Sequence, residues 1–327
     1  MESTKGFKKI FNQKMVTLII LLLIVFGTFT IMSKGAYLSG PNIRAMLSLM
    51  SVTGLLTLGV GCLIISGNID LSTGANGTMC GVVLAILLQA GIPWPIVLIL
   101  TLAIGGLVGA CNAALVNVLG FQPFIATMAV SSVVQGLTFV FCEGQPVPVR
   151  NDVIVYIGTG RIFNTIPVSI IVLLVAFIGY GLMLSKSKFG RSIYLIGGNR
   201  QAARLSGIHP VKTSYILFIN CGILSSLAGI LLAARLKSGT TAGITASQFA
   251  GMTAAMLGGV SFGGGSGSFS GVFIGLLIIN GFNNGLTLLG VLSFWQTFAS
   301  GALLIFALTI DFLNGRRVQR TLAVGAE

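Results

Sequence analysis

The chain has 327 residues, of which 54% are hydrophobic and only 8% are charged, and its formal net charge is +13. A soluble domain of this length and composition would expose large apolar patches, so the composition predicts an integral membrane protein. The basic excess is confined to tails and loops, where it is explained by orientation against anionic lipid. We therefore expect no nucleic-acid partner.

Hydrophobic runs without charge predict about ten transmembrane helices in a bilayer about 30 Å thick. The first run, 15–32, follows a basic stretch; we interpret it as a span, with a cleaved signal peptide as the alternative. Two runs, 74–90 and 249–262, are weaker because they are short and interrupted by glycine. The other expected spans are 45–65, 94–119, 124–141, 166–184, 215–234, 269–289 and 294–310.

The distribution of Lys and Arg predicts the orientation of these spans. With a cytoplasmic amino terminus, alternation of ten spans puts thirteen basic residues inside and six outside, as the positive-inside rule requires. Both termini are then cytoplasmic, and 313–327 is a cytoplasmic tail. The thirteen are Lys5, Lys8, Lys9, Lys14, Lys186, Lys188, Arg191, Arg200, Arg204, Lys212, Arg316, Arg317 and Arg320.

The two weak spans are the third and eighth of ten, which are equivalent places in two five-helix halves. Five crossings per half make the second half inverted relative to the first. Short, glycine-interrupted segments at such places point to a transport path near the membrane midplane. The alternative is that the glycines serve only close helix packing.

A single domain spans 1–327, with a polar loop at 185–214 that separates six spans in 1–184 from four in 215–312. The loop carries six basic residues and no acid, so we expect it on the cytoplasmic side. Within it, 199–208 has the composition of a short helix, and Gly207 and Pro210 supply stop signals.

Asp70 stands between the second and third expected spans, where an unpaired carboxylate is costly. Asp70 or Ser72 is expected to cap the first amides of the following helix, and a gating or coupling contact is the alternative. Within the spans, three uncharged polar residues could bond a neutral solute, although bonds between helices are the alternative for each. They are Asn112, Gln135 and Asn280.

No catalytic or metal constellation is present in the sequence, so an enzyme is not expected. The chain has one His, scattered acids and cysteines without metal-ligand spacing, which supports neither a carboxylate pair, a Ser-His-Asp triad nor a metal site. The glycine cluster 258–267 lacks the Lys-Ser or Lys-Thr of a phosphate-binding loop, so we expect a tight turn. The span interiors hold no acid or His, which argues against ion coupling and for an external energy source.

Four segments, in this order, resemble the permease subunits of bacterial ABC importers for ribose, xylose, galactose and related monosaccharides. They are 67–74 (GNIDLSTG), 122–127 (QPFIAT), 189–208 (FGRSIYLIGGNRQAARLSGI) and 258–271 (GGVSFGGGSGSFSG). The resemblance implies a multi-pass protein of the bacterial plasma (inner) membrane. It implies as partners a cytoplasmic ABC ATPase that binds the ATP, a second permease copy or paralogue, and an extracytoplasmic sugar-binding protein; this chain itself would hold no cofactor.

The resemblance also implies a coupling helix that docks on the ATPase. Its pattern of Glu-Ala-Ala, three residues and Gly falls on Gln201, Ala202, Ala203 and Gly207, with Arg204 as a basic flank. Gln201 replaces the glutamate, which removes a charge but keeps length and hydrogen bonding. Two small alanines allow close approach to a partner groove, whereas the alternative is a helix that only rests on lipid headgroups.

The expected function is a permease that passes a pentose or hexose by alternating access. Three alternatives remain open from the sequence. One is an ABC permease for a nucleoside, a quorum signal or another small polar solute; the second is a carrier or channel that works alone; the third is an integral membrane enzyme.

Overall fold

Long helices form wherever the sequence has an uncharged apolar run. The computed structural model describes the backbone of residues 2–241 and 243–324, and the side chains of 15–309 except 242, 245 and 246. Seven of the thirteen basic residues counted as cytoplasmic lie outside the side chains so described, as does the expected tail, 313–327. They are Lys5, Lys8, Lys9, Lys14, Arg316, Arg317 and Arg320.

The elements follow one another as helices with four very short strands. They are α1 (Glu2–Met32), the 3-10 helix η1 (Ala36–Leu38), α2 (Gly40–Ile65), α3 (Thr73–Gln89), α4 (Trp94–Asn117), α5 (Pro123–Cys142), β1 (Val147–Pro148), α6 (Asp152–Thr159), β2 (Arg161–Ile162), β3 (Ile166–Pro167), α7 (Val168–Lys186), α8 (Lys188–Gly198), α9 (Arg200–Leu205), α10 (Pro210–Leu236), β4 (Ser238–Gly239), α11 (Thr245–Leu257), α12 (Phe269–Leu288) and α13 (Ser293–Val324). Strands β1 and β4 pair antiparallel, as do β2 and β3.

An all-α membrane protein is confirmed. Within the described residues, seven helices are long and apolar enough to cross a membrane: Met15–Met32 of α1, and α2, α4, α5, α7, α10 and α12. Helix α3 and the Ser293–Thr309 part of α13 are apolar but shorter. The weak span expected at 249–262 is instead α11, which has 13 residues and ends at Leu257, before Gly259 with its φ of 95°.

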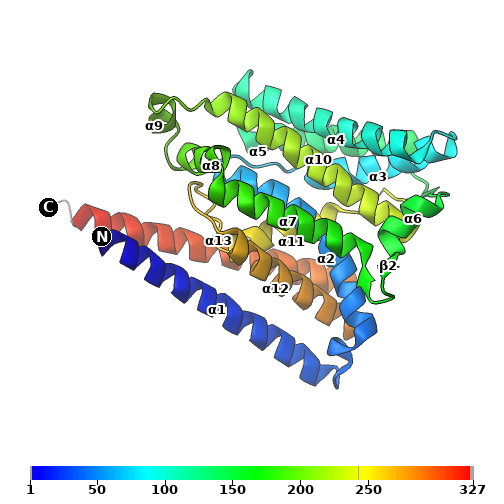
Figure 1. Ribbon diagram of the computed structural model, residues 1–327, viewed down its shortest axis with the longest axis horizontal. Coiled ribbons are helices and arrows are strands. Elements are labelled where there is room, and N and C mark those ends of the chain that lie inside the picture. Colours follow the sequence, from blue (N-terminus) through cyan, green and yellow to red (C-terminus); the bar gives the residue numbers. More distant parts are fainter. Residues whose placement is uncertain (1, 242, 325–327) are drawn as a thin grey trace.

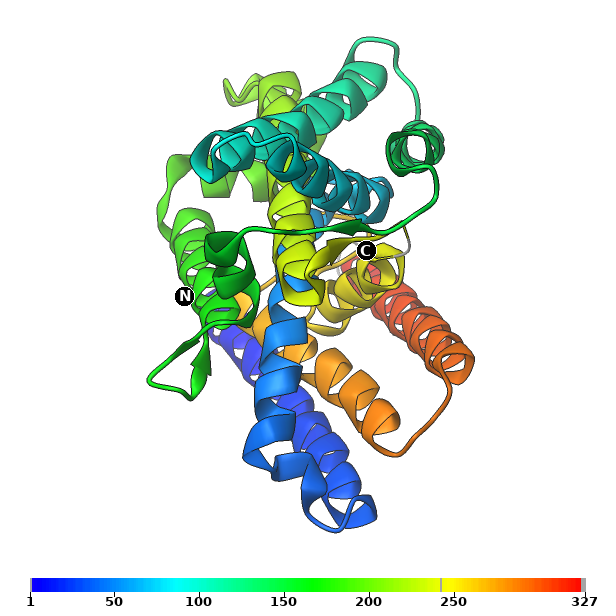
Figure 2. The same cartoon turned by 90° about the vertical axis from the view of Figure 1, so that its right-hand side faces the viewer.

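Helices α2 and α10 pass through the middle of the bundle (Figure 2). Gly222 of α10 lies directly against Gly105 of α4, and Gly229 of α10 lies against Gly77 of α3, so closely that a Cβ atom on either α10 glycine would overlap the facing carbonyl oxygen. Asn76 of α3 donates to the Gly105 and Gly222 oxygens, both at 3.2 Å. Close packing by small residues, one of the two alternatives for the glycines, is therefore observed at this crossing.

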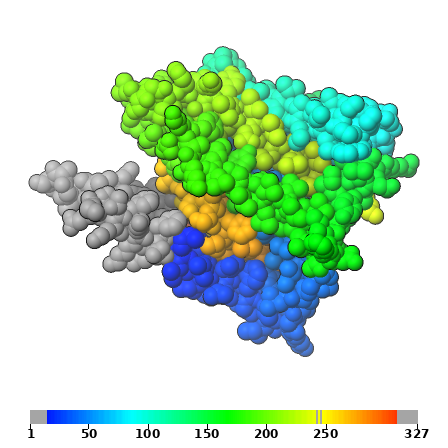
Figure 3. Space-filling model, in the orientation of Figure 1, coloured from blue at the N-terminus to red at the C-terminus, as the bar shows by residue number. Residues whose placement is uncertain are grey.

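The connections gather at two opposite ends of the bundle (Figure 1). Helices α8 and α9 lie at one end with the amino end of α1 and the carboxyl end of α13; we call it the α9 end. Helices η1 and α6 and the β2–β3 hairpin lie at the other end. On one side of the molecule α12 is visible between α1 and α7 (Figure 3). The amino end of α1 and the carboxyl end of α13 therefore lie at the same end of the bundle as the basic loop.

Candidate functional site

The short helix α9 lies within the basic loop and is bounded by a cap at each end. The side-chain oxygen of Asn199 accepts bonds from the amides of Gln201 and Ala202, both at 2.9 Å, which is a side-chain cap at the N-cap position. Gly207 adopts a φ of 77°, and its amide donates to the Arg204 oxygen at 3.0 Å. The expected helix at 199–208 is thus shorter, Arg200–Leu205, because Asn199 caps its beginning and the chain turns at Gly207 after its end.

The predicted coupling residues all lie in α9 and the turn after it. Gln201, Ala202 and Arg204 are exposed, whereas the Ala203 side chain is turned inward and is only 2% exposed. Leu205, which was not among the predicted coupling residues, is 91% exposed. The sequence contains a sign of this, because an apolar residue in an otherwise polar loop either packs against the protein or is exposed to a partner.

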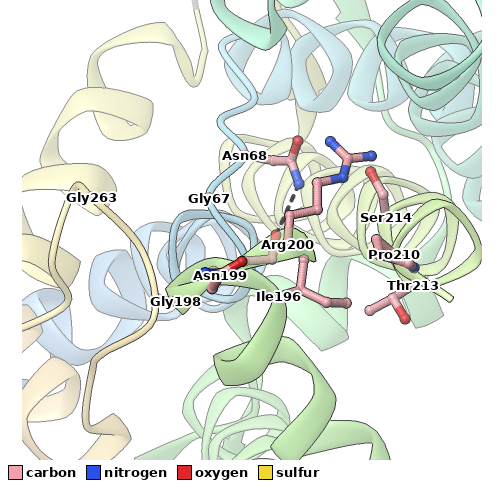
Figure 4. Close-up of a pocket in the computed structure, with 12 residues that line it drawn as sticks. Gly67, Asn68, Ile196, Gly198, Asn199, Arg200, Pro210, Thr213, Ser214 and Gly263 are labelled. Atoms are coloured by element: carbon pink, nitrogen blue, oxygen red, sulfur yellow. Dashed lines mark hydrogen bonds between the residues drawn. The ribbon is translucent and has the colours of Figure 1, made fainter. Parts of the chain in front are cut away.

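A pocket of about 270 Å³ lies beneath α9 (Figure 4). Its lining contains one cation, Arg200, and no acid. The Arg200 guanidinium donates to the side-chain oxygen of Asn117 at 3.4 Å. The side-chain amide of Asn117 in turn donates to the Ser214 hydroxyl at 3.0 Å. The pocket is lined by Ser66, Gly67, Asn68, Ile196, Gly197, Gly198, Asn199, Arg200, Pro210, Thr213, Ser214 and Gly263. Space is therefore left between α9 and the ends of α2 and α10.

The carboxylate of Asp70 is buried in the turn between α2 and α3, where it is 1% exposed. It accepts bonds from the amide and the hydroxyl of Ser72, at 2.7 and 2.6 Å, and from the Asn112 amide at 3.3 Å. The Asn112 amide also donates to the Ser72 hydroxyl at 2.7 Å. Burial raises the pKa of Asp70, and the bonds from Ser72 and Asn112 oppose that rise. We call Asp70, Ser72 and Asn112 the Asp70 latch, because it joins this turn to α4.

The beginning of α3 is capped by a residue that the sequence reasoning did not identify. Asp70 bonds the Ser72 amide, which precedes the helix, and Ser72 makes no side-chain cap bond. The Gly74 amide donates to the Gln248 side-chain oxygen of α11 at 2.8 Å. The expectation that Asp70 or Ser72 caps the first amides of this helix is therefore corrected. Because Gln248 lies 174 residues away, only the tertiary structure brings it here.

The three polar residues expected along a solute path do not come together. Asn112 is fully buried in the Asp70 latch. Gln135 of α5 is half-buried, and its amide donates to the Thr241 oxygen at 3.0 Å. Asn280 donates to the Leu276 oxygen of its own helix at 2.9 Å. In this conformation each makes a protein contact, and the described residues contain no group of three His, Cys, Asp or Glu suited to a metal ion.

Comparison with known proteins supports the resemblance seen in the sequence. Residues 42–308 match the family described as the permease component of the branched-chain amino acid transport system. The chain is 36% identical to the ribose import permease protein RbsC of Bacillus subtilis (strain 168), over 84% of this chain and 86% of that protein. It is 31% identical to the xylose transport system permease protein XylH of Haemophilus influenzae, over 94% and 98%.

A third relative, the D-allose transport system permease protein AlsC of Escherichia coli (strain K12), is 33% identical over 93% of each chain. No match was found among solved structures. The family match covers most of the chain, and the relatives align over nearly their whole length. This chain is therefore a multi-pass membrane protein that belongs to the family of branched-chain amino acid transport system permease components.

Proposed function

We propose that this chain is the membrane-spanning permease of an ATP-driven importer of a monosaccharide, a pentose or hexose. The relatives named for ribose, xylose and allose support the solute class. The observation that carries the coupling is α9, a capped helix at one end of the bundle that exposes Gln201, Ala202 and Arg204 beside the exposed Leu205. Small and apolar groups on an exposed, capped helix suit a groove in a partner ATPase.

In this proposal the chain supplies no catalytic group, and ATP is bound by the partner ATPase. A second copy of the chain, or a paralogue, completes the path, and an extracytoplasmic binding protein delivers the sugar. About ten crossings in two inverted halves place both termini in the cytoplasm. ATP binding and hydrolysis shift the balance between inward-open and outward-open states, and this difference in stability drives alternating access.

Gln201 is proposed to contribute a neutral hydrogen bond to the docking surface. Of the three solute-path candidates, Gln135 is the one that retains exposed surface on a spanning helix. Solute contacts by Asn112 or Asn280 would need another conformation of the transport cycle. A nucleoside or another small polar solute is the competing substrate class, and equilibrium binding of candidate solutes to the cognate binding protein separates these classes.

The docking surface is tested by Ala202→Asp. A carboxylate at this exposed position enlarges and charges the small-residue face, so co-purification of the ATPase should fall by at least about tenfold while membrane insertion is unchanged. The matched control is Ala36→Asp, an equally small exposed residue in η1 at the opposite end. Equal ATPase recovery with both variants refutes the assignment of α9 as the coupling helix.

A further inference from the structure

Three segments that are far apart in the sequence meet through their backbones beneath α9. The amide of Gly265 donates to the Ile65 oxygen at 2.8 Å. Gly197, near the end of α8, lies so close that a Cβ atom there would overlap the Ile65 oxygen and stand 2.5 Å from the Gly265 nitrogen. Gly264, in the same segment as Gly265, packs closely against Gly67 and Gly197. We call Gly67, Gly197, Gly264 and Gly265 the glycine junction.

The glycine junction is attached directly to α9. Only Asn199 separates α8 from α9, and α8 is held to the bundle by the buried side chains of Ile193 and Ile196. The Tyr194 hydroxyl donates to the Gly267 oxygen at 3.1 Å. Because backbone meets backbone, no flexible side chain at the junction can absorb a displacement of α8.

The other side of the junction leads into the turn before α3. Asp70, three residues after Gly67, belongs to the Asp70 latch that holds α4. The next amide, that of Leu71, donates to the Thr127 hydroxyl of α5 at 3.0 Å. Gln248 of α11 caps Gly74 in the first turn of α3, so the turn and the beginning of α3 together are bonded to α4, α5 and α11.

We propose that the glycine junction and the Asp70 latch form the route by which displacement of α9 reaches α3, α4, α5 and α11. The inference rests on the proposed function, in which an ATPase displaces α9. Gly197 and Asn112 are then positioning residues for transport: Gly197 packs on Ile65, Asn112 holds Asp70 and Ser72, and each fixes how one moving part follows another. Substitution of either residue should abolish solute movement while ATP hydrolysis continues and the ATPase stays bound.

Two adjacent glycines of α8 provide the test. Gly197→Ala forces the end of α8 away from Ile65, whereas Gly198→Ala is the matched control because nothing lies within 4 Å of its added Cβ. Each complex, with its cognate ATPase, is reconstituted in proteoliposomes, supplied with its cognate sugar-binding protein and given radiolabelled D-ribose, D-xylose or D-allose. Uptake by Gly197→Ala should fall at least about tenfold, with ATPase recovery and ATP hydrolysis within about twofold of wild type. Gly198→Ala should match wild type in all three readouts.

A second variant and a second measurement keep the inference falsifiable. Asn112→Ala acts at the far end of the route and should likewise lose uptake while keeping ATP hydrolysis. It provides the test if Gly197→Ala fails to insert into the membrane. The solute-independent readout is the labelling rate of Cys111 by a membrane-permeant maleimide, because Cys111 is exposed on the surface of α4 next to Asn112 while the other four cysteines are buried. ATP with vanadate should change this rate in wild type and Gly198→Ala but not in Gly197→Ala or Asn112→Ala.

The outcomes separate this route from the proposed function. A wild-type chain that recovers no ATPase refutes the proposed function, and the route with it. A wild-type complex that binds ATPase but imports none of the three sugars excludes these sugars as the solute, and Cys111 labelling then decides the route. Wild-type uptake by Asn112→Ala, or an unchanged nucleotide effect on Cys111 in both variants, overturns the route while docking at α9 stands.

Discussion

At the scale of single residues, Asp70 is an acid buried among the uncharged side chains of Ser72 and Asn112. An asparagine at this position has the same shape and still offers one oxygen to the Ser72 amide and hydroxyl. Its amide could meet the Asn112 side-chain oxygen, which is buried and has no hydrogen-bond partner. The hydrogen bonds, more than the charge, are therefore expected to stabilise the turn before α3.

Two substitutions of Asp70 distinguish the contribution of its hydrogen bonds to stability from that of its charge. Asp70→Asn should change the free energy of unfolding by no more than about 1 kcal/mol, because it also removes the cost of burying a charge. Asp70→Ala should cost about 2–4 kcal/mol, because it leaves the buried donors of Ser72 and Asn112 without an acceptor. Thermal unfolding of the purified protein in detergent measures both. Equal losses in the two variants would mean that the carboxylate charge itself is required.

The same carboxyl group gives a pH dependence of known sign. Burial raises the pKa of Asp70 above its unfolded value, so the folded state binds this proton more strongly than the unfolded chain. Its contribution to stability is complete below the unfolded pKa of about 3.9 and is lost as pH rises through the folded pKa. Asp70→Asn should remove this component from a series of unfolding curves, and an identical pH profile in the variant would contradict it.

At the scale of elements, α10 is positioned by glycines that let three helices cross in contact. Gly222→Ala should destabilise the protein by about 1–3 kcal/mol, because its Cβ would overlap the backbone of Gly105. Gly136→Ala is the matched control, since this α5 glycine is exposed and has nothing within 4 Å of an added Cβ. Unfolding midpoints in one detergent provide the comparison. A larger loss in Gly136→Ala would place the critical packing on α5 instead.

The elements also show what sequence reasoning can reach. Spans were predictable because length and lack of charge are local properties, and α9 was found from its composition and stop signals. Helix α8 was missed because its glycines and basic residues suggested a loop, although Ile193 and Ile196 face the core. The cap by Gln248 and the contact of Gly197 with Ile65 depend on tertiary neighbours, and no local pattern contains them.

For the whole molecule, the two ends of the bundle carry equally exposed apolar side chains that can report orientation. Leu205 of α9 and Phe163 of the β2–β3 hairpin are each 91% exposed, and they lie at opposite ends (Figure 1). The basic loop around α9 predicts that its end faces the cytoplasm, because Lys and Arg are retained on that side of the membrane. A single labelling experiment can therefore fix the orientation of the entire chain.

In a Cys111→Ser background, a membrane-impermeant maleimide applied to intact spheroplasts should label Phe163→Cys and leave Leu205→Cys unlabelled. Permeabilising the membrane should make Leu205→Cys react at a comparable rate, since the two side chains are equally exposed. The background without an added cysteine controls for the four buried native thiols. If Leu205→Cys reacted first in intact spheroplasts, α9 would face away from any cytoplasmic ATPase, and neither docking at Ala202 nor the route through Gly197 could operate.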